Sequence, residues 1–259
     1  MNYSKLNLQF LSQAVFLFSL ALLFTFSSCK KDETTPDDGT DTGTDEVPAV
    51  YKKIYGASDI YLEGNFVVIK TNGTPDHKSP YYTDAAKYEA YNGTNSAWNQ
   101  NPNKIASFNF TFKIPLNPVK ASNNAATPLG VMGVSLNGVA FFNQYAGPNN
   151  QPLTSEINSF DQYNGHPQQQ GVYHYHVEPL YLTSTKGKDA LLGFLLDGFP
   201  VYGVTENGAT VQNADLDEFH GHTHATADYP NGIYHYHITG AAPYINGNGF
   251  YGTAGTVTQ

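Results

Sequence analysis

Histidines are the residues of this chain that could do chemistry. Five of the nine lie within an eighteen-residue stretch that ends at His237. That stretch closes with the tetrapeptide Tyr-His-Tyr-His, and the same four residues occur once more, earlier in the chain. Side chains alternate between the two faces of a β-strand. We therefore expect His174 and His176 to share one face of their strand, and His235 and His237 to share one face of theirs.

Imidazole is the commonest nitrogen ligand for zinc and copper, so this spacing predicts a metal site. We expect the two strands to be neighbours with their four histidines on one side, so that, if they pair about a pseudo-twofold axis, four imidazoles converge on one ion. A further run, at residues 220–224, repeats the two-residue spacing. The predicted metal ligands are His174, His176, His235, His237, His220, His222 and His224. The alternative is a pair of packed aromatic strands whose histidines bond to the backbone or to solvent.

Nearby polar residues could orient such ligands or act as a general base. A carboxylate orients a ligand imidazole by accepting its free ring N–H, and it can also take a proton from metal-bound water. The candidates for these roles are His166, Asp197, Asp215, Asp217 and Glu218. Each also has a plain structural interpretation, as a turn residue or as part of a solvated acidic segment. His77 follows a proline-containing turn and is interpreted as a surface histidine.

The N-terminal segment predicts export and a lipid anchor. Residues 1–28 combine a positive Lys5 with an apolar run too short for a membrane span, which is typical of a signal peptide. Cys29, the only cysteine, follows two serines and resembles the lipidated residue of a bacterial lipoprotein. Residues 29–50 are rich in Asp, Thr and Gly, as in a flexible tether, and their Lys-Lys-Asp-Glu resembles the surface-export signals of Bacteroidetes lipoproteins. We expect an outer-membrane lipoprotein that faces the cell surface or the periplasm.

Charge and composition exclude some partners and favour an all-β fold for residues 51–259. The chain has no arginine and a formal net charge of −9, which argues against nucleic acid as a partner. Its 24 glycines and 15 prolines interrupt short apolar runs, and no long amphipathic pattern is present. We predict one mainly antiparallel domain with few short helices, in which a sandwich is favoured over a barrel. The expected strands cover residues 66–71, 106–114, 131–136, 139–142, 171–177, 191–196, 201–203 and 233–238.

Several ordered motifs give the chain a family resemblance. Gly171-Val-Tyr-His-Tyr-His, Asp197-Gly-Phe-Pro-Val-Tyr-Gly and Tyr229-Pro-Asn-Gly-Ile-Tyr resemble the bacterial YHYH-domain proteins, and the likeness extends over nearly all of residues 51–255. The resemblance implies no particular reaction. In many members an acidic motif reads LDECNG, where this chain has Phe219 and His220 in place of the cysteine and asparagine.

Three functions remain open from the sequence. The first is a module that binds zinc or copper through the clustered histidines. The second is a metalloenzyme, hydrolytic or oxidative, that uses the same site. The third is a metal-free module in which tyrosines and asparagines bind a carbohydrate or another small molecule.

Overall fold

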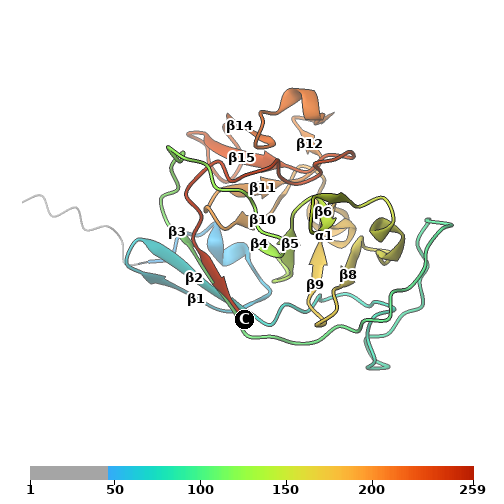
Figure 1. Cartoon of the computed structure of the whole chain (residues 1–259). Coiled ribbons are helices and arrows are strands. Elements are labelled where there is room, and N and C mark those ends of the chain that lie inside the picture. Colours follow the sequence, from blue (N-terminus) through green and yellow to red (C-terminus); the bar gives the residue numbers. More distant parts are fainter. Residues whose placement is uncertain (1–45) are drawn as a thin grey trace, which may run out of the picture. The chain divides into compact units, whose positions relative to one another are not determined.

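The computed structural model describes residues 46–259 (Figure 1). The predicted signal peptide, the cysteine predicted to be lipidated and most of the predicted tether lie outside the described residues. The strands are β1 (Ala57–Glu63), β2 (Phe66–Thr71), β3 (Phe110–Pro115), β4 (Val131–Ser135), β5 (Ala140–Phe142), β6 (Tyr145–Gly147), β7 (Gln151–Pro152), β8 (Gly165–Pro167), β9 (Tyr173–Tyr175), β10 (Leu191–Leu195), β11 (Pro200–Tyr202), β12 (Thr205–Glu206), β13 (Ala209–Thr210), β14 (Gly221–His224), β15 (Ile233–His237) and β16 (Thr256–Thr258). The helical elements are one α-helix, α1 (Leu180–Lys186), and three 3-10 turns, η1 (Tyr51–Lys53), η2 (Glu156–Ser159) and η3 (Asn213–Asp215).

Two sheets form the framework. The smaller sheet has the antiparallel order β1-β2-β3-β16, and the larger has the mixed order β14-β15-β11-β10-β4-β5-β9-β8. Figure 1 shows the larger sheet running from β14 to β8, with β1, β2 and β3 to one side of it. Two short hairpins, β6-β7 and β12-β13, lie outside these sheets. The all-β prediction is confirmed, and the described residues form no closed barrel.

One continuous apolar core joins the two sheets. Phe110, Phe112 and Ile114 alternate with half-buried residues along β3, because every second side chain of this strand points inward. They belong to the same buried cluster as Val134 of β4 and Phe194 of β10, which are central in the larger sheet. Val47 and Val50, within the predicted tether, also pack against it. No helix among residues 46–259 is long and apolar enough to cross a membrane.

The larger sheet is an internal duplication. Segments β4 to β9 and β10 to β15 each contain, in order, an antiparallel hairpin, a short outlying hairpin and a second antiparallel pair. In each segment the last strand also pairs in parallel with the second strand of the first hairpin, β9 with β5 and β15 with β11. The two copies meet where β4 pairs antiparallel with β10, with Val134 opposite Phe194. The sheet order is therefore symmetric about this pair. The sequence predicted only the repeated Tyr-His-Tyr-His strand, which is one part of this larger unit.

The expectation that the two Tyr-His-Tyr-His strands are neighbours is wrong. Four strands, β11, β10, β4 and β5, lie between β15 and β9 in the sheet. At about 4.8 Å per strand the two motifs are roughly 24 Å apart. At this distance the two motifs cannot share one metal ion. They lie far apart because each motif strand pairs only with strands of its own copy of the repeat.

Candidate metal centres

Each copy of the repeat places three histidines side by side at one end of the sheet. In the first copy β8 pairs with β9 so that His166 lies opposite His174. In the second copy β14 pairs with β15 so that His222 lies opposite His235. Directly opposed residues share a face of the sheet, and the second histidine of each Tyr-His-Tyr-His motif follows two residues later on that face.

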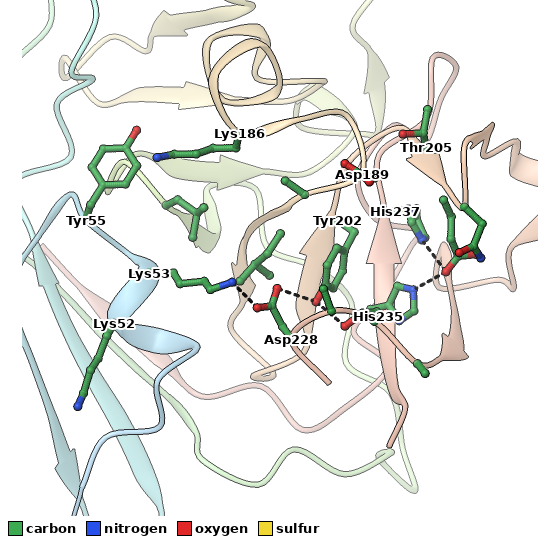
Figure 2. A pocket seen from close by; sticks show the side chains of 18 residues that line it. Lys52, Lys53, Tyr55, Lys186, Asp189, Tyr202, Thr205, Asp228, His235 and His237 are labelled. Atoms are coloured by element: carbon green, nitrogen blue, oxygen red, sulfur yellow. Dashed lines mark hydrogen bonds and ion pairs between the residues drawn. The ribbon is translucent and has the colours of Figure 1, made fainter. Parts of the chain in front are cut away.

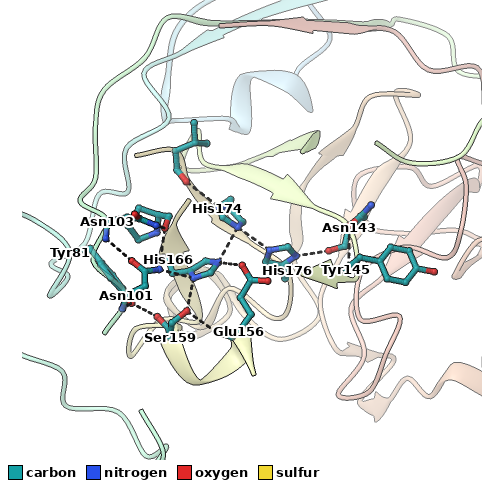
Figure 3. Close-up of polar contacts among 12 residues, drawn as sticks. Tyr81, Asn101, Asn103, Asn143, Tyr145, Glu156, Ser159, His166, His174 and His176 are labelled. Atoms are coloured by element: carbon teal, nitrogen blue, oxygen red, sulfur yellow. Dashed lines mark hydrogen bonds and ion pairs between the residues drawn. The ribbon is translucent and has the colours of Figure 1, made fainter. Parts of the chain in front are cut away.

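Site A is the group formed by Glu156, His166, His174 and His176 (Figure 3). The Nε2 atom of His174 lies 3.1 Å from that of His166 and 2.9 Å from that of His176. A carboxylate oxygen of Glu156 lies 3.2 Å from Nε2 of His166. Tetrahedral ligation with bonds of about 2.05 Å separates ligand nitrogens by about 3.3 Å, close to the spacing at this site.

Site B is the equivalent group in the second copy, formed by Glu206, His222, His235 and His237. The Nε2 atoms of His222 and His235 are 3.1 Å apart. Glu206 approaches all three rings, with oxygen-to-Nε2 distances of 3.5 Å to His222, 3.5 Å to His235 and 3.9 Å to His237. In both sites the candidate donor atoms lie within 4.8 Å of one another. Either group could therefore hold a metal ion.

The other ring nitrogen of the motif histidines bonds to the backbone. Nδ1 of His174 donates to the carbonyl of Val172 at 3.0 Å, and His176 donates to the carbonyl of Asn143. At the equivalent positions of site B, His235 donates to Ile233 at 2.9 Å and His237 to Gly203 at 2.8 Å. A carbonyl can only accept, so these contacts fix the proton of a neutral ring on Nδ1 and leave a lone pair on Nε2.

Converging lone pairs need a cation or a proton between them. Protonation is disfavoured, because burial lowers the pKa of His176 and of His237 to about 4 and lowers that of His174 well below its usual value. Two polar atoms also lack a hydrogen-bond partner although they are buried: Nε2 of His237 and one carboxylate oxygen of Glu156. A bound metal ion would satisfy both sets of atoms, so the donors fit such an ion.

A matching turn positions the first histidine of each site. Asp161 and Asp217 each accept a tyrosine hydroxyl from the next strand, at 2.8 Å from Tyr173 and 2.8 Å from Tyr234. Each aspartate also accepts the N–H of the glycine that precedes the site histidine. Three residues after the aspartate the backbone turns left-handed, with φ of 64° at Asn164 and 73° at the residue in the corresponding position of the second copy. The tyrosine face of the motif thus holds the turn that carries the histidine.

The structure separates the predicted ligands into groups. His174 and His176 belong to site A, whereas His222, His235 and His237 belong to site B. His224 lies beside site B, with Nδ1 3.0 Å from Glu206, and its side chain is 55% exposed. His220 lies in neither group. It occupies the left-handed turn position, and its Nε2 contacts Asn213 and Thr239 instead.

The residues predicted to assist the ligands have varied positions. His166 is brought into site A itself. Asp197 accepts the hydroxyl of Tyr236 at 2.6 Å, which places it behind the sheet from the histidines. Asp215 caps η3 through the N–H of Gln212. Asp217 supports the turn described above, and the exposed Glu218 is in neither metal group.

Sequence reasoning missed Glu156 and Glu206 as site residues. Glu156 begins η2, and Glu206 ends the two-residue strand β12, so the two differ in their place within the repeat. Neither has a characteristic spacing from the histidines. A signal for the third histidine was present, since Asp-Gln-Tyr-Asn-Gly-His at 161–166 aligns with Asp-Glu-Phe-His-Gly-His at 217–222.

A cavity of about 840 Å³ opens beside site B (Figure 2). His235, His237 and Glu206 form part of its wall. Tyr202, whose hydroxyl contacts Thr226 and Asp228, forms another part.

Comparison with known proteins agrees with the motif pattern. The family model described as YHYH protein matches residues 111–210 and 204–250, which together make up more than half of the chain. The match begins later than the resemblance noted from the sequence and leaves residues 51–110 outside it. No curated protein and no solved structure matches the chain. The two segments matched by the family model include both Tyr-His-Tyr-His motifs and every residue of sites A and B, and the chain belongs to the YHYH protein family.

Proposed function

We propose that the protein binds two divalent transition-metal ions, one at site A and one at site B. The observation that supports this most directly is the convergence of Nε2 atoms, on which the Nδ1–H bonds of the four motif histidines to backbone carbonyls leave a lone pair. Structural and catalytic metal sites commonly orient their histidines in this way. Packing alone does not require the Nε2 atom of one imidazole to point at the Nε2 atoms of two others.

Zinc and copper are the two metals that suit these donors. Three imidazoles and one carboxylate fill a tetrahedral zinc shell, while copper(II) has the higher intrinsic affinity for imidazole. We propose no choice between them. Both are consistent with the absence of a free thiol among residues 46–259.

Metal analysis of single-site variants tests the proposal. The full-length chain, purified without an affinity tag and dialysed against excess zinc or copper, should retain two ions. His174→Ala and His235→Ala should each retain one, and the double variant none. His220→Asn is the matched control, because asparagine stands at the same left-handed position in the first copy and His220 is in neither group. It should retain two ions.

Thermal unfolding gives a second readout on the same samples. Each ion should stabilise the fold by about 3 kcal/mol when its free concentration is one hundred times the dissociation constant. Chelation should remove this increment from the wild type and change nothing in the double variant. If the wild type retains no metal and its melting curve is the same with and without chelator, the proposed function is wrong.

The carbohydrate alternative has less support. Its sugar-stacking platform would need exposed aromatic faces, but the motif tyrosines Tyr173, Tyr175 and Tyr236 are fully buried. Their hydroxyls bond within the protein, to Asp161, Asn137 and Asp197.

We further propose that the chain is an outer-membrane lipoprotein anchored through Cys29. The support is the apolar run before Cys29 and the acidic segment after it. Replacing Cys29 with serine should move the protein from the membrane fraction into the periplasm or the medium, or stall its processing. Unchanged membrane retention with normal cleavage would count against the anchor.

A further inference from the structure

The two sites differ in what covers their imidazoles. At site A, Phe142 stacks on His174 with ring centroids 3.8 Å apart, and Phe160 packs against His166 and His176. The residue equivalent to Phe142 in the second copy is Tyr202. Its ring meets His235 edge-on at 5.1 Å. Its hydroxyl is held by Thr226 at 2.7 Å, and it forms part of the cavity wall.

The cavity at site B has mixed walls. Apolar side chains, among them Leu136, Leu191 and Ala227, line it together with part of the metal-binding group and a set of charged residues. Its volume of about 840 Å³ is in the range typical of small-molecule sites. In Figure 2, Lys186 reaches across the cavity toward Tyr55, on the side away from His235 and His237. Its Nζ lies 4.5 Å from the centroid of that tyrosine ring.

The charges around this cavity depend on the metal. Its lining contains three lysines, Lys52, Lys53 and Lys186, and three carboxylates, Asp189, Glu206 and Asp228, so it carries no net formal charge. Two of the lysines are paired, Lys53 with Asp228 and Lys52 with Glu46. A divalent ion at site B gives the cavity two net positive charges. The cavity therefore favours an anion more strongly when the metal is bound.

We propose that site B is the ligand-binding centre of the protein and takes a small organic carboxylate. The carboxylate would contact the metal ion as a ligand additional to the three imidazoles and Glu206, and its organic body would lie along the apolar wall toward Lys186. This rests on the proposed metal binding. Site A, where phenylalanine rings pack against the imidazoles, would hold its ion without such a ligand. The cavity lining offers no arginine fork, which favours a carboxylate over a phosphate as its ligand.

Cobalt(II) substitution tests this inference, because the visible spectrum of cobalt reports on a change of its ligands. The full-length chain carrying His174→Ala keeps only site B, and the chain carrying His235→Ala keeps only site A. Each is loaded with cobalt, the bound metal is measured, and benzoate is titrated in. Benzoate should shift the spectrum of the site B protein with saturation and leave that of the site A protein unchanged. Benzamide, the neutral analogue, should have no effect on either.

A charge variant tests the cavity itself. Lys186→Gln should weaken benzoate binding at site B by about twofold or less, because Lys186 lies on the side of the cavity away from the metal ligands and acts on the carboxylate only through the charge of the cavity. Lys120→Gln is the control, since Lys120 packs on Tyr251 and does not line the cavity. It should bind benzoate like the parent.

Four outcomes overturn the inference. With cobalt bound at site B, these are no spectral shift, an equal shift at site A, and an equal response to benzamide. The fourth is a failure of site B to bind cobalt, which would also overturn the proposed metal function. Measuring bound cobalt before the titration distinguishes this failure from the other three.

Discussion

The metal-free protein should lose stability as the pH falls from about 6.5 to 4. His176 and His237 are 3% and 1% exposed, and burial lowers the pKa of each from 6.5 to about 4 in the folded state. A depressed folded pKa means that the unfolded chain binds protons first. The stability associated with the neutral rings is therefore complete above about pH 6.5 and is lost as the pH falls through the folded value.

The size of this loss follows from the two pKa values. At pH 5 an unfolded histidine is almost fully protonated, whereas a folded one with a pKa of about 4 is mostly neutral. The difference costs roughly 2 kcal/mol for each residue, or roughly 4 kcal/mol for His176 and His237 together. That is a large part of the total stability of a typical folded domain, which is roughly 5–15 kcal/mol.

Urea denaturation at pH 7.5 and pH 5, with a chelator present throughout, measures this loss. The double variant His176→Gln/His237→Gln keeps a polar side chain at each position but removes the titration. Its stability should fall by roughly 4 kcal/mol less than that of the wild type. Comparing the two proteins cancels the buried Asp161 and Asp197, whose raised pKa values act in the opposite direction.

A wild-type protein whose stability changes between pH 7.5 and pH 5 by the same amount as that of the double variant would refute the reasoning, because any loss would then come from other groups.

Two further predictions concern the framework that positions the histidines. Gly165→Ala should destabilise the protein by about 1–3 kcal/mol in chemical denaturation, because the added Cβ would lie 2.4 Å from the ring of the buried Tyr173. Gly147→Ala is the control and should be nearly neutral, because its added Cβ would meet nothing nearer than 3.8 Å. Tyr236→Phe should cost about 1–3 kcal/mol, since it removes a buried donor to Asp197, while Tyr145→Phe at an exposed contact should cost less than about 0.5 kcal/mol; equal losses in the two variants would contradict this account.

The alternation of side chains along a strand predicted two histidines of each site. The other residues of each site are set by the pairing of strands that are distant in sequence. The two-residue spacing placed His174 with His176 and His235 with His237, because side-chain direction in a strand depends only on sequence separation. The distance between the motifs depends on strand order, which no local pattern specifies. His166 joins site A because β8 pairs with β9 in one register, and a shift of one residue would turn it to the other face.

The glutamates could not be predicted for a related reason. Glu156 reaches site A from a 3-10 turn, and Glu206 reaches site B from a short hairpin. Carboxylates on such segments have no periodicity, and most acidic residues in turns are simply solvated. His220 shows the opposite failure, a residue predicted as a ligand that lies in neither group. Its spacing matched that of the ligands, but its φ of 73° breaks the strand geometry on which the spacing argument depends.

The differences between the two copies of the repeat separate framework from function. Where the first copy has Asn137 and Asn164, the second has Asp197 and His220, yet both pairs perform the same task. Asn137 and Asp197 contact the tyrosines behind the histidines, and Asn164 and His220 occupy the same left-handed turn. These exchanges preserve the positions of the tyrosines and of the turn.

The exchange of Phe142 for Tyr202 has a different consequence. The phenylalanine lies flat on His174 at site A, whereas the tyrosine meets His235 edge-on and forms part of the cavity wall. The motif histidines are buried at both sites, and the difference is that a cavity lies beside site B. Such a difference would let one site hold a metal for stability and the other present its metal to a ligand. The aromatic residue after the first hairpin of each copy is therefore the position at which we expect the two sites to have acquired different roles.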